Sequence, residues 1–500
     1  MVNCLKVCNG VAINVRTWRG NRWNKESITP ESRAMSGCEQ TPIHILAFPY
    51  PAQGHMLPLL DLAHQLLLTN LNLTLTLVVT PKNLPFLNPL LSAHPTCIET
   101  LVLEFPLHPS LPPGVENVKD IGNLGNVPII NALAKLHSPI LHWFNSHASP
   151  PVAIISDFFL GWTHHLAHQL RIPRITFYSS GAFLACVSDH LWLNADALLS
   201  SPVVSFPHLP KAPSFSADHL PSVFRHYRGS DPEWRFVRDC MTANTLSWGR
   251  VFNTFGALER EYVEHLRSQM GHHRVWSVGP LVLPGGSGSL NRGNSNPDSA
   301  ATDAVLGWLD GCPDGTVVYV CFGSQKLLKP NQVAALASGL EGSGGRFIWV
   351  MKAGSLPPDG FEERVGERGK VIKGWAPQVS ILSHRAVGGF LSHCGWNSLM
   401  EALVCGAMIL GWPMEADQYV NAMLLVDHLG AAVRVCEGDE TVPDSAEVGR
   451  TIAKAMSEDF PQKRRAKELR DEALGAVLPG GTSSRDLIGL VQELVQQRQV

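Results

Sequence analysis

Short apolar runs alternate with amphipathic segments in two separate parts of the chain, and this alternation restricts the possible folds most strongly. In the first part, the apolar run Ile43–Phe48 precedes a loop with two prolines and a glycine, then apolar residues at helical spacing from Leu59 to Leu67. A second β-rich run, Leu73–Thr80, follows. Strand, helix and strand in this order predict a parallel sheet.

The same order returns in the second half of the sequence. We expect further strands at Val152–Ser156, Arg174–Tyr178, Val317–Phe322, Phe347–Met351, Lys370–Gly374, Gly389–Ser392 and Met408–Gly411. We expect helices at Pro330–Leu340, near Val379–Ser383, near Ser398–Val404 and at Arg485–Gln497. Between the two halves, residues 284–304 are rich in Gly, Ser, Asn and Pro, which is typical of a linker.

The sequence therefore predicts an α/β protein with two Rossmann-like parallel-sheet domains facing a central cleft, where open sheets bind ligands. The predicted parts are a disordered N-terminal extension (1–40), a first domain (41–283), a flexible linker (284–304), a second domain (305–478) and a C-terminal helix (479–500) that packs back toward the first domain. The first 40 residues are basic before Glu26 and lack an apolar period. We interpret them as a disordered extension or an upstream start, with Met35 as the alternative initiator and a transit peptide as the other possibility.

Composition excludes several classes of function. The net charge is −3 and no Lys/Arg cluster forms a basic stripe, which argues against a nucleic-acid partner. No apolar stretch approaches the roughly 18 residues that a membrane span needs. The eleven cysteines are scattered without paired spacing, which indicates a reduced, cytoplasmic protein. His393 and Cys394 have only His384 nearby, and this spacing is unlike a zinc site, so we expect no metal.

The segment "SHCGWNSLME", residues 392–401, joins an expected strand to an expected helix. Gly395 lets the backbone approach a ligand closely, and the amides at the start of the helix favour an anion. His393, Asn397 and Ser398 add side-chain hydrogen-bond donors, so a phosphate or diphosphate is the expected ligand. The alternative is local: Ser398 and Glu401 also have the spacing of a capping box.

The span from Trp375 to Gln418, "WAPQVSILSHRAVGGFLSHCGWNSLMEALVCGAMILGWPMEADQ", resembles the sugar-nucleotide signature of plant family 1 UDP-dependent glycosyltransferases of secondary metabolites. The segments "YPAQGHMLPLLDLA" and "GWLD…VVYVCFGS" also look like family segments, so the resemblance covers about residues 41–498. It is strongest for the flavonol and phenolic branch. The family usually has Pro where Met408 stands, at the entry to a strand. The resemblance implies the GT-B fold, with an acceptor-binding first domain and a donor-binding second domain.

The resemblance also implies a donor site made of Ser324, Trp375, Ala376, Gln378, His393, Gly395, Trp396, Asn397, Ser398, Glu401, Asp417 and Gln418. In the family, the residue matching Trp375 stacks on uracil and the one matching Glu401 accepts hydrogen bonds from the ribose. Asp417 and Gln418 would hold sugar hydroxyls. The alternative for Asp417 is that it only caps the helix that follows it.

His55 and Asp157 match the catalytic pair of this family. His55 opens a helix after a strand and a loop, where a neutral imidazole can take a proton from an acceptor hydroxyl. Asp157 ends the apolar run "PVAIISD" and would stabilise the imidazolium that forms. No Asp-x-Asp occurs, so we expect the start of the helix near residue 395 to replace a metal ion at the diphosphate.

These features predict an inverting, metal-independent enzyme without a cofactor, a monomer that makes a β-O-glucoside from UDP-glucose and a small aromatic acceptor. Phe158, Phe159, Phe177 and Tyr178 are the expected acceptor walls, with core packing as the alternative for each. Other donors, such as UDP-rhamnose or UDP-galactose, and a terpenoid acceptor remain open. A nucleotide-sugar epimerase and a non-catalytic sugar-nucleotide binder are the alternatives from other classes.

Overall fold

The computed structural model describes residues 18–19, 22–23, 42–69, 72–284, 299–352 and 354–497. In the N-terminal segment, β1 (Trp18–Arg19) pairs antiparallel with β2 (Arg22–Trp23). The rest of the predicted extension, including Met35, lies outside the described residues.

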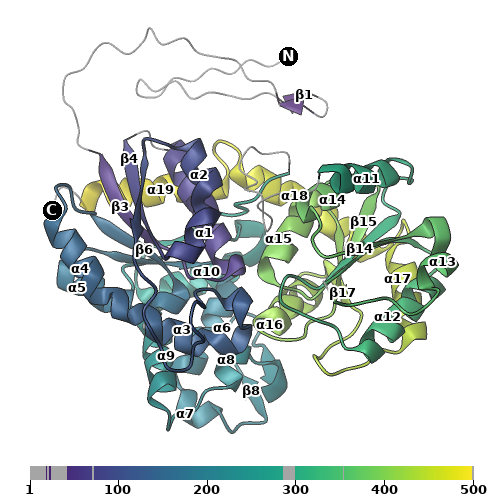
Figure 1. The fold of residues 1–500 in the computed structure, drawn as a ribbon, viewed down its shortest axis with the longest axis horizontal. Helices are drawn as coiled ribbons and strands as arrows, with labels where there is room; N and C mark the ends of the chain where they lie inside the picture. Colours follow the sequence, from purple (N-terminus) through teal and green to yellow (C-terminus); the bar gives the residue numbers. More distant parts are fainter. Residues whose placement is uncertain are drawn as a thin grey trace. The chain divides into compact units, whose positions relative to one another are not determined.

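A sheet of seven parallel strands forms the centre of the N-terminal domain (Figure 1). In spatial order its strands are β11 (Val275–Ser277), β10 (Gly249–Phe252), β7 (Arg174–Tyr178), β6 (Ala153–Asp157), β3 (Ile43–Phe48), β4 (Leu73–Val79) and β5 (Ile98–Val102). Alternate residues of β3 enter different cores: Ile45 and Ala47 pack on one face of the sheet, whereas Leu46 and Phe48 pack on the other. Both faces are therefore covered, as a parallel sheet requires.

Helices cover the two faces of this sheet, with α1 on one and α5 and α6 on the other. The helices are α1 (Gln53–Thr69), α2 (Asn88–Ala93), α3 (Asn126–Leu133), α4 (His137–Ser146), α5 (Thr163–Leu170), α6 (Ala182–Leu193), α7 (Ala195–Leu198), α8 (Ser222–Arg225), α9 (Pro232–Ala243) and α10 (Gly256–Met270). A small antiparallel pair, β8 (Val203–Ser205) and β9 (Ser214–Ser216), lies between α7 and α8 in the chain.

The C-terminal domain contains a second parallel sheet, of six strands. Its order is β14 (Gly369–Lys373), β13 (Arg346–Met351), β12 (Val317–Cys321), β15 (Val387–Ser392), β16 (Met408–Gly411) and β17 (Ala432–Arg434). Its helices are α11 (Ser299–Asp310), α12 (Pro330–Gly342), α13 (Phe361–Val365), α14 (Gln378–Leu382), α15 (Trp396–Cys405), α16 (Gln418–Met423), α17 (Ser445–Ala455) and α18 (Pro461–Val477). Helix α11 begins inside the predicted linker, of which residues 285–298 lie outside the described part.

The last helix, α19 (Thr482–Gln497), returns to the N-terminal domain (yellow in Figure 1). Leu490, Val491 and Leu494 of α19 join the core that contains α1 and Trp276 of β11. The two domains are thus connected by the chain twice, once before α11 and once before α19.

The predicted strands and helices are confirmed to within a few residues, with two informative differences. Helix α1 begins at Gln53, well before the apolar spacing that starts at Leu59, so His55 is its third residue. Helix α15 begins at Trp396 with Gly395 as its N-cap, so Ser398 lies inside the first turn and the capping-box interpretation is wrong.

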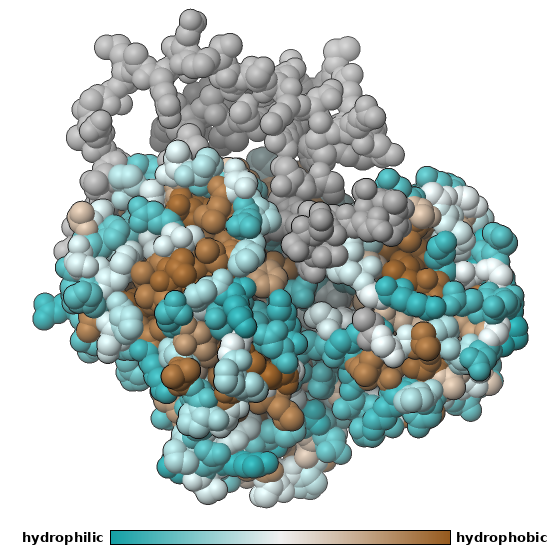
Figure 2. All heavy atoms as spheres, in the orientation of Figure 1, coloured by the Kyte–Doolittle hydropathy of each residue, from teal (hydrophilic) through white to brown (hydrophobic). Residues whose placement is uncertain are grey.

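No helix in the described ranges is long and apolar enough to cross a membrane. On the face drawn in Figure 2, hydrophilic side chains separate the apolar patches from one another.

Candidate active site

A cavity of about 660 Å³ lies between the two domains and is lined by residues of both. In each sheet the cavity lies where the strand order reverses. In the N-terminal sheet, β3 lies between β4 and β6; in the C-terminal sheet, β12 lies between β13 and β15. At such a point the loops after neighbouring strands diverge and leave a crevice at the carboxyl edge. The predicted two-domain architecture with a central cleft is confirmed.

His55 and Asp157 meet at this edge of the N-terminal sheet. His55 Nδ1 donates to Asp157 Oδ2 at 3.0 Å, and the His55 side chain is 20% exposed whereas that of Asp157 is fully buried. The second carboxylate oxygen, Oδ1, accepts from the backbone N–H of Phe159 at 2.9 Å, which fixes the orientation of the carboxylate. Because Nδ1 carries the proton that faces Asp157, Nε2 is the nitrogen that can accept a proton.

Three aromatic rings hold the His55 imidazole in place. Phe158 stacks on it at 5.2 Å between ring centroids, Phe159 lies at 4.7 Å, and Tyr50 makes an edge contact at 5.3 Å. Phe158 and Phe159 also line the cavity, so this wall is flat and apolar next to the proton acceptor.

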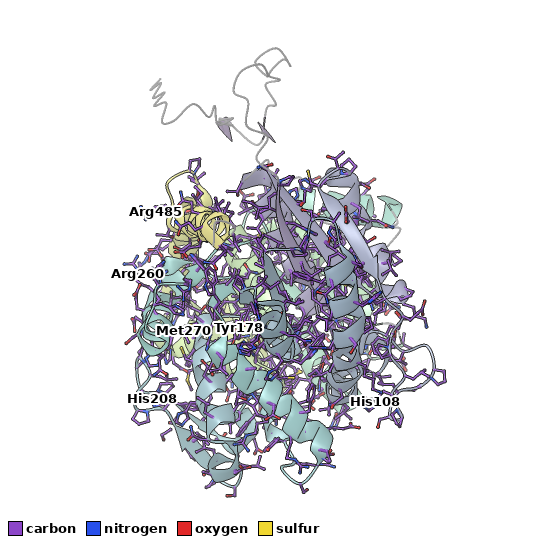
Figure 3. The ribbon with its side chains drawn as sticks, turned by 90° about the vertical axis from the view of Figure 1, so that its left-hand side faces the viewer. His108, Tyr178, His208, Arg260, Met270 and Arg485 are labelled. Carbon is purple, nitrogen blue, oxygen red and sulfur yellow. The ribbon has the colours of Figure 1, made fainter. Side chains whose placement is uncertain are left out.

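Phe177 and Tyr178 do not line the cavity, contrary to the sequence-based expectation. Both belong to β7, whose residues are buried on both faces. Phe177 enters the core beneath α1, and Tyr178 stacks on Phe158 and Phe252 in the interior of the domain (Figure 3). Of the four aromatic candidates, only the two that follow β6 reach the cavity.

The turn between β15 and α15 contributes to the wall of the cavity from the C-terminal domain. Cys394 has a left-handed backbone (φ +65°), and Asn421 of α16 donates to its carbonyl oxygen at 3.0 Å. This conformation directs the start of α15 toward the cavity, which Gly395, Trp396, Asn397 and Ser398 line. The first turn of a helix presents amides that have no partner within the helix, together with the positive end of its dipole. The turn is therefore suited to bind an anion.

The His393 ring lies between two glycines of the cavity wall. A Cβ atom on Gly323 would be 2.7 Å from His393 Cε1, and one on Gly395 would be 2.6 Å from His393 Nε2. Burial lowers the pKa of His393 to about 4, so this imidazole is neutral at neutral pH and brings no charge to the cavity wall. Ser324, in the loop after β12, lines the same part of the cavity.

Trp375, Ala376, Gln378 and Glu401 lie together at the end of the cavity next to β14. Gly374 has a left-handed backbone (φ +103°) and turns the chain from β14 into this segment. Gln378 Nε2 donates to Glu401 Oε2 at 2.8 Å and to Ser398 Oγ at 3.2 Å. A half-buried indole next to a carboxylate and an amide is suited to a planar base with a ribose.

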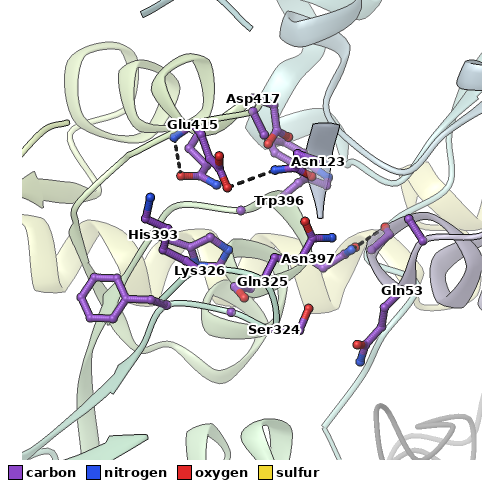
Figure 4. A pocket seen from close by; sticks show the side chains of 18 of the residues that line it. Gln53, Asn123, Ser324, Gln325, Lys326, His393, Trp396, Asn397, Glu415 and Asp417 are labelled. Atoms are coloured by element: carbon purple, nitrogen blue, oxygen red, sulfur yellow. Dashed lines mark hydrogen bonds between the residues drawn. The ribbon is translucent and has the colours of Figure 1, made fainter. Parts of the chain in front are cut away.

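Trp396 and Asn397 also connect the two domains. The indole N–H of Trp396 donates to the backbone oxygen of Asn253 at 2.9 Å. Asn397 Nδ2 donates to the backbone oxygen of Gly54 at 2.7 Å (Figure 4). Trp396 is 4% exposed, so most of its side chain is buried at the domain interface. The sequence predicts it as a donor-binding residue. Asn397 places the start of α15 beside the residue that precedes His55.

Asp417 and Gln418 follow β16 and line the cavity near His55. Burial raises the pKa of Asp417 above its usual value. A hydrogen bond from Asn421 and the nearby His55 oppose this shift only in part. Asp417 precedes α16 but its side chain makes no capping hydrogen bond, so the simple capping role is not observed. Gln418 Oε1 accepts from the backbone N–H groups of Met414 and Glu415, both at 2.9 Å.

Sequence reasoning missed several polar residues of the cavity wall, among them Asn123, Gln325, Lys326 and Glu415. Gln325 and Lys326 directly follow Ser324, so their position after a parallel strand was a usable signal. Asn123 begins a short 3-10 helix (Asn123–Gly125) before α3, and no local pattern marks it as a site residue. In the part of the chain that the structure describes, no group of three His, Cys, Asp or Glu side chains is arranged to hold a metal ion.

Comparisons with known proteins agree on one family. Residues 295–455 match the family described as UDP-glucoronosyl and UDP-glucosyl transferase. UDP-glycosyltransferase 89A2 of Arabidopsis thaliana is 51% identical over 91% of this chain and 96% of that protein. The flavonol 3-O-glucosyltransferase UGT89B1 of Arabidopsis thaliana is 49% identical over 91% of this chain and 97% of that protein.

Solved structures show the same similarity. The structure of Arabidopsis thaliana UGT89C1 complexed with UDP-L-rhamnose has a TM-score of 0.75 at 39% identity, covering 91% of this chain and 99% of that chain. The structure of Medicago truncatula UGT71G1 complexed with UDP-glucose has a TM-score of 0.77 at 25% identity, covering 91% and 98%. Sequence identity over nearly the full length and the shared architecture lead to one conclusion: this chain belongs to the plant family 1 UDP-dependent glycosyltransferases.

Proposed function

We propose that this enzyme transfers glucose from UDP-glucose to a hydroxyl group of a flavonol or another small phenolic, giving a β-O-glucoside. One observation carries the proposal: His55, which is bonded to the buried Asp157, and the start of α15 line the same cavity. A proton acceptor and an anion site that face the same space are what sugar transfer from a nucleotide diphosphate needs.

The reaction follows from this arrangement. His55 Nε2 takes the proton of the acceptor hydroxyl, and the oxygen attacks the anomeric carbon from the face opposite UDP. The bond from that carbon to the diphosphate oxygen breaks, and its electron pair leaves with UDP. Asp157 stabilises the imidazolium, and the α15 amides stabilise the charge on UDP. Displacement at an α-linked donor inverts the anomeric carbon and gives a β-linked product.

The apolar wall supports a flat aromatic acceptor. Phe158 and Phe159 adjoin the imidazole, and Leu184, Trp192 and Met241 extend the lining into the N-terminal domain. Aromatic and apolar walls with few polar groups suit a planar ring system. The relative at 49% identity is a flavonol 3-O-glucosyltransferase, and a flavonol 7-O-rhamnosyltransferase of Arabidopsis thaliana is 40% identical.

The donor sugar has two candidates. Glucose is favoured by Gln418, because the family residue at this position tends to accompany glucose. Rhamnose is the second candidate, because UGT89C1 was solved with UDP-L-rhamnose and resembles this chain at 39% identity.

We propose that neither a metal ion nor a cofactor takes part, and that UDP-glucose is a co-substrate. The support is the position of α15, whose first turn supplies amides and a dipole at the diphosphate. Activity is expected to survive EDTA. Loss on chelation with recovery on adding manganese would contradict this part of the proposal.

The deciding experiment is a panel of phenolic and terpenoid acceptors with UDP-glucose, UDP-rhamnose and UDP-galactose, in which product mass, position and anomeric configuration are determined. We expect a β-O-glucoside of a flavonol as the major product. Incubation with UDP-glucose and no acceptor tests for an epimerase, which would yield a new nucleotide sugar. A non-catalytic protein would bind UDP-glucose but glycosylate no acceptor of the panel.

A further inference from the structure

The geometry points to Asn123 and Glu415 as a pair of positioning residues that hold the sugar-binding loop of the C-terminal domain against the acceptor domain. This inference rests on the proposed function, because it concerns how the Met414–Gln418 loop recognises the donor sugar. Neither residue was expected at the site from the sequence.

The loop is fastened to the N-terminal domain at two points. Asn123 Nδ2 donates to Glu415 Oε1 at 3.0 Å across the domain boundary, as Figure 4 shows. The backbone N–H of Ser222 donates to the carbonyl oxygen of Ala416 at 3.2 Å. The Asn123–Glu415 bond joins two side chains, so it can be removed by mutation. The Ser222–Ala416 bond joins two backbone groups and cannot be removed by changing a side chain.

The loop needs such support because its backbone is unusual. Ala416 has a left-handed backbone (φ +54°), which an alanine adopts at a cost of about 1 kcal/mol or more. Gln418 Oε1 closes the loop from inside by accepting from the N–H groups of Met414 and Glu415. The Asn123 contact acts on the same turn from outside, so it helps to hold Asp417 and Gln418 in the cavity.

The contact continues to the catalytic histidine. Asn126 Nδ2 donates to the carbonyl oxygen of Asn123 at 2.9 Å, and the Tyr50 hydroxyl donates to Asn126 Oδ1 at 2.7 Å. The Tyr50 ring contacts the imidazole of His55. A chain of hydrogen bonds and one ring contact therefore link the sugar-binding loop to the base, so that donor position and proton acceptor are set by one arrangement.

The test exchanges the donor and acceptor of this bond. Asn123→Asp places two carboxylates face to face, and we expect UDP-glucose to bind about tenfold more weakly while UDP affinity stays within about twofold. Glu415→Gln keeps an acceptor oxygen, and we expect a loss of no more than about threefold. The double variant Asn123→Asp/Glu415→Gln restores a hydrogen bond with reversed roles, and we expect it to regain most of the affinity.

Calorimetry with UDP-glucose and with UDP gives the readout, and kcat and KM are measured in parallel. Tyr262→Phe is the matched control, because Tyr262 OH and His428 Nδ1 form another interdomain hydrogen bond, at 2.7 Å, outside the cavity. We expect this control to leave the ratio of the two affinities unchanged.

Three outcomes would overturn the inference: an Asn123→Asp variant that binds both ligands like wild type, a double variant no better than that single variant, or an equal loss for UDP and UDP-glucose. A changed ratio of the UDP-glucose and UDP affinities in Tyr262→Phe would also overturn the inference. A wild-type enzyme that transfers no glucose would overturn only the proposed function, because the affinity ratio needs no turnover.

Discussion

At the scale of single residues, the proposed reaction depends on the bond between His55 Nδ1 and Asp157 Oδ2. The buried carboxylate is held by a backbone N–H, so it orients the imidazole before any substrate binds. The aromatic rings around the imidazole limit its rotation. Asp157 and the three rings that contact the imidazole all belong to the N-terminal domain.

Replacing His55 by Ala should reduce kcat by about 10²–10⁴-fold, because the acceptor hydroxyl loses its proton acceptor. UDP affinity should change little, since the residues proposed to bind the diphosphate belong to the C-terminal domain. Initial rates and calorimetry measure the two effects. Asp157→Asn, which keeps the shape but removes the charge, should also slow turnover. Transfer by His55→Ala near the wild-type rate would contradict the assignment.

His393 should make folding stability sensitive to acid. Burial lowers its pKa from 6.5 to about 4, so between these pH values the unfolded chain binds a proton that the folded chain does not. The contribution of this residue is present in full above pH 6.5 and is lost as the pH falls toward 4. We expect the melting temperature to fall less between pH 7 and pH 5 in His393→Asn than in wild type. Parallel curves for the two proteins would show that this histidine does not contribute.

At the scale of elements, the start of α15 combines three features that the proposed anion site needs. Cys394 has a left-handed backbone, the His393 ring approaches Gly395 closely, and the first turn of the helix lines the cavity. Gly395 has an ordinary backbone (φ −65°), so the glycine is required by space and not by conformation. A side chain there would meet the His393 ring.

Gly395→Ala should therefore weaken UDP binding by about tenfold, because the added methyl displaces His393 from the diphosphate region. Calorimetry with UDP measures this effect. Gly475→Ala is the matched control: it lies in α18, and a Cβ atom there would meet nothing within 4 Å. This control should leave UDP affinity unchanged and stabilise the fold by about 0.5–1 kcal/mol. Equal UDP affinity in Gly395→Ala and wild type would contradict the packing argument.

At the scale of the whole molecule, α19 joins the end of the chain to the N-terminal sheet. Its buried leucines complete the core around α1, whose first turn carries His55. The stability of the N-terminal domain therefore depends on α19.

Leu490→Ala should lower the free energy of unfolding by about 2–5 kcal/mol, because Leu490 is fully buried and leaves a cavity. Ile488 lies on the same helix and is 42% exposed, so Ile488→Ala should cost less than about 0.5 kcal/mol. Chemical denaturation of both variants measures the difference. Similar losses in both would show that α19 does not pack as described.

The sequence alone determined the elements and the identity of the chemistry. Apolar runs of strand length and helical spacing are local properties, so the strands β7 and β16 are predicted to the residue. His55, Asp157 and the segment after β15 are recognisable because they match motifs of the family. All three lie at the carboxyl ends of parallel strands, which share one edge of each sheet.

The tertiary structure decided what each side chain contacts. It placed Phe158 and Phe159 at the cavity but turned Phe177 into the core, because adjacent strand residues face opposite sides of a sheet whose faces are both apolar. It also brought Asn123 to Glu415 across 292 positions of sequence. Contacts of this kind depend on how the two domains pack against each other, and no local pattern of residues predicts which side chains will meet there.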